Sequence, residues 1–458
     1  MSKSAPTRRE FLQLTVGASA FAAGLPLLSS LGRALADPPR GDDEFFLFIH
    51  AAGGWDVTLW SDPRNERKGI VEPASTANTD TGPLHHWKDA PLDRDARTFA
   101  ILQPPGSSRR FGPGIGNLID LHDRFLIVNG LAMNTVSHPD GTAFSATGRH
   151  LQGGRVPQSS VNTVLANEFG TAQKFPSISV QFPSSYVGDH LDRRAVPLLV
   201  DRIGNIGNTL SRPALYDTSV DREAVTALLS KEASQLAAQS TYPDALQGMA
   251  LQYDGLSRML GGDLQDVFND NKLRAARPEF NYKARFHGGN AVNAAFAVEA
   301  MRRNLVRCIS FALGGLDTHG NNYRQQAQVQ QEMFDLIAAL VKVLDRTPHP
   351  TRPTEKLSQH THLLVFSDFC RTPQVNLAGG RDHYPNNSAL VISPRFRGGT
   401  TFGRSDGEQL LPIGAKRFAD GERAIAPPDL LATFVSAFGV EPQRYFRDGE
   451  IVRELLAA

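Results

Sequence analysis

Short runs of apolar residues recur along the chain, each bounded by Gly, Pro, Asp or Ser. Runs of this length without polar alternation are typical of strands that are covered on both faces of a sheet. We therefore predict strands at residues 45–49, 125–128, 178–182, 196–200, 308–313, 363–366 and 389–392.

Helical patterns fall between many of these runs. The clearest is residues 325–345, where six apolar residues recur at helical spacing on one face. Further helices are predicted at residues 221–239, 242–260, 290–303 and 428–438. The alternation predicts an α/β fold, a large and mostly parallel sheet sandwiched by helices. Residues 203–290 show no convincing strand, so we predict a helix-rich insertion there that could form a cap.

The N-terminus has the layout of an export signal. Arg8 and Arg9 precede a weakly apolar stretch at residues 12–31, and Ala34-Leu35-Ala36 is a small-residue cleavage site. The arginine pair indicates the twin-arginine export machinery as a partner and a periplasmic or secreted location. The alternative is a membrane anchor, but Ser, Thr, Gln and Pro interrupt the stretch. We predict a signal peptide at 1–36, an exported domain at 37–458 and no stable membrane span after cleavage.

The net charge and the cysteine content exclude some classes of protein and partner. Cleavage would remove four basic side chains and one acidic side chain, so the formal charge of +1 becomes about −2. A nearly neutral chain gives no reason to expect nucleic acid or an anionic membrane as a partner. Cys308 and Cys370 are the only cysteines, which excludes a disulfide framework. We expect two buried thiols on neighbouring strands, although pairing after export stays open.

Polar residues with metal-binding chemistry follow several of the predicted strands. In a parallel sheet, the carboxyl ends of the strands meet at one edge, where ligands bind. Four strand ends and one loop would bring to this edge Asp56, Asp317, His319, Asp368, Asp382 and His383. Gathered carboxylates repel one another, and a divalent cation removes that repulsion. Mixed Asp and His ligands suit zinc, manganese or a similar ion.

Each of these residues also has a structural alternative. A lone Asp after a strand is often a helix cap or a turn residue, and Asp382-His383 alone could be an exposed loop. A hydroxyl nucleophile could come from the loop that contains Ser137 and Thr142. His360-Thr361-His362 precedes a strand at the opposite end of the sheet, so we predict that it lies on the surface.

At these residues, the chain resembles an exported bacterial family known as domain of unknown function 1501. The shared pieces are Gly53-Gly54-Trp55-Asp56, Ser137-His138, Gly314-Gly315-Leu316-Asp317-Thr318-His319, Asp368-Phe369-Cys370-Arg371-Thr372 and Gly380-Arg381-Asp382-His383. The family resembles a branch of the alkaline phosphatase and sulfatase superfamily. The resemblance implies an alkaline-phosphatase-like fold with one or two divalent ions (zinc, manganese or calcium) at the carboxyl edge of the sheet.

The resemblance also implies roles for individual residues. Asp56 would be the ligand after the first strand, Asp317 and His319 would bind one metal and Asp368 the other, and His383 would complete a site. Asp382 would be a ligand or would orient His383. Ser137 would lie near the nucleophile position, with Thr142 at a predicted helix start as its rival. The chain departs from the superfamily in the Asp317-x-His319 spacing and in Phe369, where His is common.

Two hypotheses for function follow. The first is an exported metal-dependent hydrolase of a small phosphate or sulfate ester, in which Arg371 neutralises substrate oxyanions. Arg371 could instead form a structural ion pair with a ligand carboxylate. The second hypothesis is a non-catalytic exported binding or assembly protein that keeps the hydrolase fold, which the departures from the superfamily pattern favour.

Overall fold

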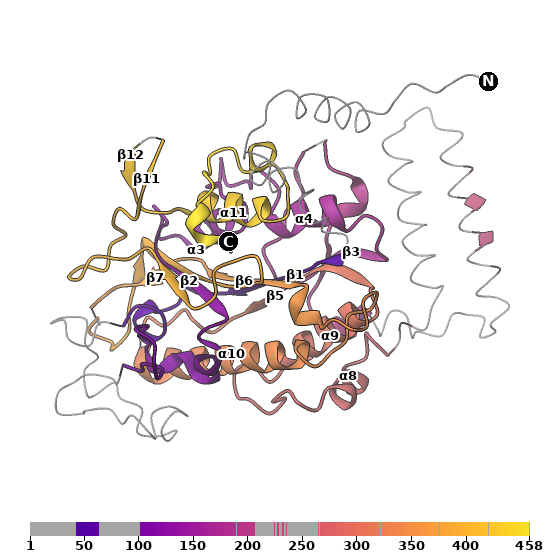
Figure 1. The fold of residues 1–458 in the computed structure, drawn as a ribbon, viewed down its shortest axis with the longest axis horizontal. Coiled ribbons are helices and arrows are strands. Elements are labelled where there is room, and N and C mark those ends of the chain that lie inside the picture. Colours follow the sequence, from indigo (N-terminus) through magenta and orange to yellow (C-terminus); the bar gives the residue numbers. More distant parts are fainter. Residues whose placement is uncertain are drawn as a thin grey trace, which may run out of the picture. The chain divides into compact units, whose positions relative to one another are not determined.

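An eight-stranded sheet forms the centre of the computed structural model (Figure 1). The structure describes residues 43–63, 101–206 and 264–457 apart from positions 189, 265, 321, 375 and 420, together with a few single positions between 224 and 235. The predicted signal peptide at 1–36 and most of the predicted helical insertion at 203–290 lie outside these residues. Both therefore stay predictions.

The sheet contains all seven predicted strands. In spatial order it consists of β10 (Thr400–Phe402), β2 (Phe125–Ala132), β9 (Asn386–Ile392), β6 (Thr361–Ser367), β1 (Phe45–Ala51), β5 (Val306–Leu313), β3 (Phe175–Val180) and β4 (Leu198–Val200). Only β9 runs antiparallel to its neighbours β2 and β6, and every other adjacent pair is parallel. The predicted mostly parallel sheet is confirmed. The short edge strand β10 was not predicted.

The apolar runs are continuous because helices cover both faces of the sheet. Along β1, Phe45, Leu47 and Ile49 belong to one hydrophobic cluster, and the alternate residues Phe46 and Phe48 belong to another. The first cluster packs the sheet against α9 (Ala291–Arg302) and α10 (Asn322–Leu344). The second packs it against α4 (Val161–Phe169) and α11 (Pro427–Ser436), with α3 (His138–Thr147) on the same side (Figure 1). The described domain is thus a three-layer α/β sandwich.

The helices α9, α10 and α11 confirm the predicted helices at 290–303, 325–345 and 428–438. The helix α4 was not predicted, and α3 begins four residues before Thr142, where a helix start was expected; both sequences are short and carry no strong apolar stripe. The remaining described elements are α8 (Asp270–Ala276), η2 (Val57–Leu59), η5 (Pro113–Leu121), η6 (Arg193–Ala195), η7 (Leu357–Gln359), η8 (Pro442–Arg444), η9 (Arg453–Leu455), β7 (Cys370–Arg371), β8 (His383–Tyr384), β11 (Lys416–Phe418) and β12 (Gly421–Arg423).

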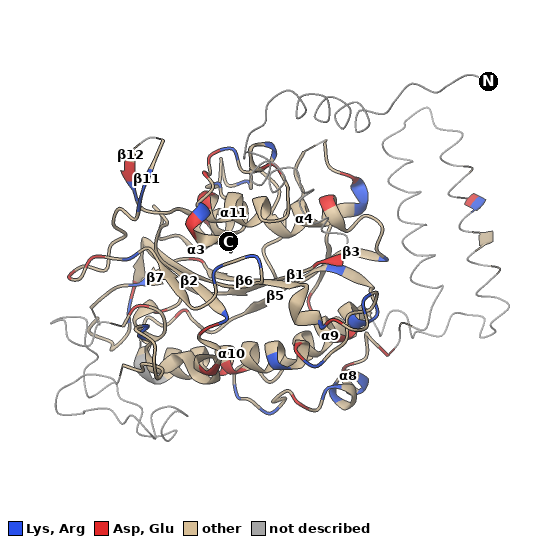
Figure 2. Ribbon diagram, viewed as in Figure 1, with Lys and Arg blue, Asp and Glu red and all other residues tan. Residues whose placement is uncertain are grey.

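Charged residues lie mainly on the helices and loops around the sheet, whereas its strands are largely uncharged (Figure 2). This distribution is what burial on both faces requires, since an unpaired buried charge is costly. Among the residues that the structure describes, no helix has the length and apolarity that a membrane span needs.

The cysteines and the histidines near β6 lie in positions that differ from the predictions. Cys308 on β5 and Cys370 on β7 are free and buried, as expected, but β5 lies beside β1 and β3, so the cysteines are not on neighbouring strands of the sheet. The prediction that His360 and His362 lie on the surface is wrong. Both are buried at the amino end of β6, where the Glu44 carboxylate lies 3.4 Å from His360 Nδ1 and 2.9 Å from His362 Nε2.

Candidate metal site

The topology of the sheet brings the candidate residues to its carboxyl edge. Asp317 and His319 follow β5, Asp368 follows β6, and His138 begins α3 after β2. His383 precedes β9, and since β9 is antiparallel to its neighbours, its beginning lies at the edge where their ends lie. The contributing strands are consecutive in the sheet, in the order β2-β9-β6-β1-β5. Residues far apart in the sequence therefore meet there.

Four of these side chains converge, and we call them the His-Asp cluster: His138, Asp317, His319 and His383. Donor atoms of His138, Asp317 and His383 all lie within 4.8 Å of one another. His319 Nε2 lies 2.9 Å from His383 Nε2 and 3.1 Å from Asp317 Oδ1. Asp317 Oδ1 is also 3.3 Å from His138 Nε2 and 3.6 Å from His383 Nε2. Asp317 is thus the common centre of the three imidazole rings.

Each of the three rings has a hydrogen-bond acceptor beside its Nδ1 atom. The acceptors are Asp368 Oδ2 at 2.6 Å for His138, Asp382 Oδ1 at 2.7 Å for His319 and the Val136 carbonyl oxygen at 2.7 Å for His383. An acceptor at Nδ1 favours the tautomer with its proton on that atom. The Nε2 lone pairs would then face the cluster, as metal ligation by histidine requires.

His138 Nε2 provides an independent test of this arrangement. The atom is buried, and it makes no hydrogen bond even though Asp317 Oδ1 is near. A buried polar atom without a partner is costly. A cation bound between this nitrogen and the Asp317 carboxylate would satisfy it, so the donor set fits a metal ion.

The electrostatics of the cluster favour an ionised carboxylate beside a neutral ring. Burial raises the pKa of Asp317, but the hydrogen bond and charge of Arg371 outweigh it and lower the pKa below its usual value. Burial lowers the pKa of His383. The hydrogen bond to Asp368 raises the pKa of His138, so a proton competes with a cation for that ring.

Asp368 lies behind the cluster rather than within it. It is almost fully buried, and its carboxylate contacts His50 Nε2 and His138 Nδ1 and accepts a hydrogen bond of 3.1 Å from the Gly53 amide. Burial raises its pKa, but the charge and hydrogen bonds of His50 and His138 hold it well below its usual range. In this geometry Asp368 orients His138 instead of serving as the predicted ligand.

Asp382 is placed differently from the prediction as well. It accepts the Nδ1 hydrogen bond of His319 and a 3.2 Å bond from the Asn376 amide, and no bond joins it to His383. The predicted orienting role therefore applies to His319. The ring of His383 is held by the Val136 carbonyl oxygen instead.

The structure does not bring Asp56 to the cluster. Asp56 is fully buried and is the N-cap residue of η2, where its Oδ1 accepts hydrogen bonds from the Thr58 amide and hydroxyl. Its Oδ2 accepts a hydrogen bond of 2.8 Å from Asn322 and lies 3.2 Å from Arg381 Nε. The capping alternative describes this residue, because both of its oxygens already have partners.

The two hydroxyl residues occupy different positions on α3. Ser137 is the N-cap residue, is exposed, and makes no side-chain capping bond. Thr142 was expected at the helix start, but α3 begins at His138, so Thr142 lies in the second turn. Ser137, directly before a cluster histidine, is therefore the better placed of the two.

Arg371 is a structural residue of the site. Its side chain is fully buried, and Nη2 donates to Asp317 Oδ1 at 2.6 Å. Its remaining donors bind backbone carbonyl oxygens, namely those of Gly53, Gly54, Leu316 and Arg381. The side chain is fully buried and each of its three nitrogens is already hydrogen-bonded within the protein, so it presents no exposed donor to a substrate oxyanion. The ion-pair alternative therefore describes Arg371, which fixes the position of Asp317.

Two residues of the site were not predicted. In the sequence, His138 stands beside Ser137, and His50 directly follows the predicted strand at 45–49. The available signal was position, since both stand at or just after a predicted strand, as Asp317 and Asp368 do. The sequence did not show which side chains along each loop turn toward the common centre.

The fold and the site together define a three-layer α/β sandwich with a candidate metal site at the carboxyl edge of its sheet. The chain belongs to the family described as "Protein of unknown function (DUF1501)", whose model matches residues 60–450. This confirms the family that the motifs indicated. A search of curated proteins gives no significant match.

Several solved structures are similar to this chain at low identity. A sulfatase from Pseudoalteromonas sp., PsFucS1, is 10% identical, with 94% of this chain and 75% of that chain covered and a TM-score of 0.38. Ps i-CgsB in complex with k-i-k-neocarrahexaose is 11% identical, with 88% and 74% covered and a TM-score of 0.36. The lipoteichoic acid synthase LtaP from Listeria monocytogenes is 7% identical, with 88% and 73% covered and a TM-score of 0.31. Because the TM-scores of these three structures are only 0.36, 0.38 and 0.31, their similarity assigns no function to this chain.

Proposed function

We propose that this protein is an exported metal-dependent hydrolase of phosphate or sulfate esters. The observation that carries the proposal is the His-Asp cluster, in which three oriented imidazole rings and one carboxylate meet at the carboxyl edge of the sheet. Ligands of α/β proteins bind at this edge. The choice of phosphate or sulfate esters as the substrate class rests on the resemblance of the chain's family to the alkaline phosphatase and sulfatase superfamily.

The donor set favours one transition-metal ion. Three imidazole nitrogens and one carboxylate suit zinc, manganese or iron, whereas calcium prefers six or more oxygen ligands. Asp368 and Asp56 have other partners, so a second ion lacks ligands among the described residues. When bound, such an ion would supply Lewis acidity for hydrolysis of an anionic ester.

The chain's own groups would hold and position the reacting parts. His138, Asp317, His319 and His383 would hold the cation, and Asp368, Asp382 and Arg371 would keep these ligands in place. The side chains of Asp317 and His319 are about half exposed, which leaves the site open to a substrate. The amino end of α3 favours an anion near Ser137.

Ser137 is our candidate for the nucleophile. Its hydroxyl oxygen would attack the phosphorus or sulfur atom, the substrate alcohol would leave with a proton, and water would then hydrolyse the seryl ester to regenerate the hydroxyl. A directly attacking water is the alternative. The Ser137→Ala variant separates them, because it removes turnover in the first case and spares it in the second.

The proposal is tested by metal content and hydrolysis together. The protein purified from its native host should contain about one equivalent of transition metal per chain. It should hydrolyse 4-nitrophenyl phosphate or 4-nitrophenyl sulfate, and Asp317→Ala should lose both the metal and the activity. Asp201→Ala, which removes an exposed carboxylate elsewhere, is the matched control. Folded protein without any metal contradicts the proposal.

One observation favours a second candidate, an exported binding or assembly protein with a bound metal. Arg371 is fully buried and each of its nitrogens is hydrogen-bonded within the protein, so it offers no exposed donor to a substrate oxyanion. This candidate predicts one equivalent of metal with no hydrolysis of either ester. The hydrolysis assay therefore distinguishes the two candidates, because both predict the same metal content.

Export is tested separately. Replacing Arg8 and Arg9 with Lys should retain the full-length protein in the cytoplasm if the twin-arginine machinery transports it. Mass spectrometry of the exported wild-type protein should give an N-terminus at Asp37. An N-terminus at Met1 or Ser2 in the exported protein would contradict cleavage.

A further inference from the structure

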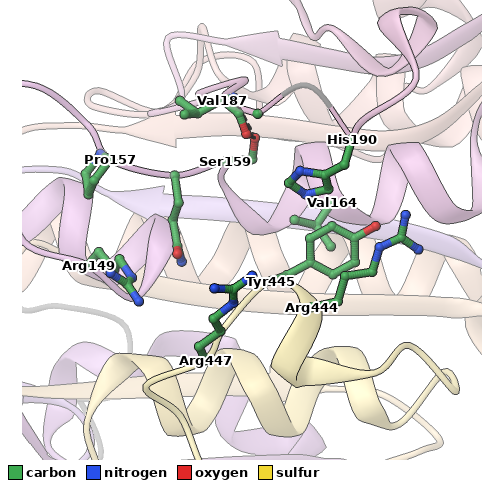
Figure 3. Close-up of a pocket in the computed structure, with 11 residues that line it drawn as sticks. Arg149, Pro157, Ser159, Val164, Val187, His190, Arg444, Tyr445 and Arg447 are labelled. Atoms are coloured by element: carbon green, nitrogen blue, oxygen red, sulfur yellow. Dashed lines mark hydrogen bonds between the residues drawn. The ribbon is translucent and has the colours of Figure 1, made fainter.

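A polar pocket lies away from the His-Asp cluster. Its walls come from the segment after α3, the residues before and within α4, three residues near position 190 (Val187, Gly188 and His190), and three C-terminal residues (Arg444, Tyr445 and Arg447) (Figure 3). The empty volume is about 690 Å³, including the open mouth. None of the cluster residues lines it. His138 begins α3 and Arg149 follows its end, so ten helical residues, about 15 Å, separate the two places.

The pocket is strongly biased toward positive charge. Arg149, Arg444, Arg447 and His190 line it, and no Asp or Glu is among those lining residues that the structure describes. Arg149 is 2.9 Å from Asp448, and Arg444 is 3.4 Å from Glu168, so two of the three arginines have an acidic partner outside the pocket. Arg447 has no ion pair with any residue in the described part of the chain. It extends its guanidinium group toward the middle of the lining residues (Figure 3).

An apolar surface lies beside these charges. The Tyr445 ring is held in place because its hydroxyl is bound to Glu168 and accepts a 3.1 Å hydrogen bond from Asn167. Val164 and the His190 ring, whose centroid is 5.8 Å from that of Tyr445, complete this surface. Tyr445 is 7% exposed and the Arg444 guanidinium lies over its ring at 5.1 Å, so a flat ligand would contact only the part of the ring that is open to the pocket.

The main chain around the pocket is also fixed and favours an anion. The Ser159 hydroxyl donates to the Val187 carbonyl at 3.0 Å and accepts from its amide at 2.7 Å, which joins two walls (Figure 3). Residues 157–159 lead directly into Ser160, the N-cap of the nine-residue helix α4. The positive end of that helix adds to the charge of the arginines.

We propose that this pocket binds a small ring-containing ligand through a phosphate or sulfate group. Arg447 and Arg149 would donate to the oxyanion, as guanidinium groups do in planar pairs with phosphate and sulfate oxygens. The ring would lie against Tyr445 and Val164. The pocket is a binding site only, and it does not depend on the proposed hydrolysis.

Titration calorimetry of the full chain tests this proposal. Phenylphosphonate and benzenesulfonate are suitable probes, since neither carries a hydrolysable ester, with inorganic phosphate, inorganic sulfate and neutral phenol for comparison. One of the two ring-containing anions should bind more tightly than its inorganic counterpart, and phenol should bind far more weakly than either. Which of the two binds identifies the phosphate or the sulfate class.

Variants locate the binding. Arg447→Gln should weaken it about tenfold or more, and Arg447→Lys should weaken it less, because Lys keeps the charge but loses the planar pair of donors. Arg417→Gln, which removes an exposed charge on β11, should bind as wild type does. Asp317→Ala should also bind unchanged, which separates this site from the His-Asp cluster.

Three results would overturn the inference. They are no binding of either probe to the wild type, undiminished binding to Arg447→Gln, and loss of binding in Asp317→Ala with the fold intact. The last result would place the probe at the cluster. Failure of the proposed hydrolase activity, by contrast, would leave every one of these binding outcomes unchanged.

Discussion

Replacement of Asp368 with Asn tests whether a buried carboxylate sets the metal affinity of the cluster. Asp368 accepts from three directions, with His50 at Oδ1 and with His138 and the Gly53 amide at Oδ2. An Asn that keeps its oxygen toward His138 and Gly53 turns its NH₂ group toward His50. The His50 ring can then accept through Nε2 if its proton moves to Nδ1. The fold should therefore survive.

The Asp368→Asn variant should bind its metal ion more weakly than the wild type. A neutral amide is a weaker acceptor than a carboxylate, so His138 Nδ1 is held less firmly and its Nε2 becomes a poorer ligand. Loss of such an orienting group typically lowers metal affinity by 10–100-fold, about 1.4–2.7 kcal/mol. Asp382→Asn should cost less, because Asp382 and His319 are both about half exposed and their bond competes with water.

The assay is competition for zinc against a chromophoric chelator, with circular dichroism to confirm that each variant is folded. We expect affinity to fall in the order wild type, Asp382→Asn, Asp368→Asn. A folded Asp368→Asn protein with wild-type zinc affinity would refute the orienting role. A larger loss in Asp382→Asn than in Asp368→Asn would refute the argument from burial.

Three further predictions concern the support of the site and the stability of the fold. Gly53 has a φ of +110° and an added Cβ would lie 2.6 Å from the Asp317 amide nitrogen, so Gly53→Ala should lower both zinc affinity and the unfolding free energy, the latter by at least about 1 kcal/mol in urea titration. Arg371→Met removes a fully buried cation that binds Asp317 and four carbonyl oxygens, and it should cost about 3 kcal/mol or more; an unchanged urea midpoint would contradict the structural role. Burial lowers the pKa of His287 to about 4, so the neutral form is favoured in the fold, and stability is lost as pH falls from the unfolded pKa of 6.5 toward 4. Between pH 7 and pH 5 the wild type should therefore lose about 2 kcal/mol relative to His287→Gln, and parallel pH profiles would show that His287 titrates normally.

The strands were predictable because their signal is local. A strand covered on both faces must be apolar at every position, and β1 places alternate residues in two separate hydrophobic clusters. The long amphipathic helix α10 was predictable for the same reason, since one sequence segment contains its whole apolar stripe. For α3 only a helix start at Thr142 was expected, four residues too late, because its ten residues are largely buried small and polar groups without a clear stripe.

The site could be predicted only in part, because direction matters as well as position. Asp56 follows a strand as Asp317 does, but it turns into the protein to cap η2 and meet Arg381. Nothing in the spacing distinguishes these two residues. Arg371 likewise has the chemistry of an oxyanion-binding residue, and only its burial among backbone carbonyl oxygens shows that its donors are already used.

By itself, the sequence determined the α/β class, the family and the stretches from which the site is built. Those features follow from local patterns: apolar runs, helical spacing and polar residues after strands. Only the tertiary structure decided which side chains converge. The antiparallel strand β9 brings His383 beside His319, and the α3 start brings His138 to Asp317. Ligand geometry depends on contacts between residues far apart in the sequence, 64 positions for His319 and His383 and 179 (317 minus 138) for His138 and Asp317, and no local pattern contains them.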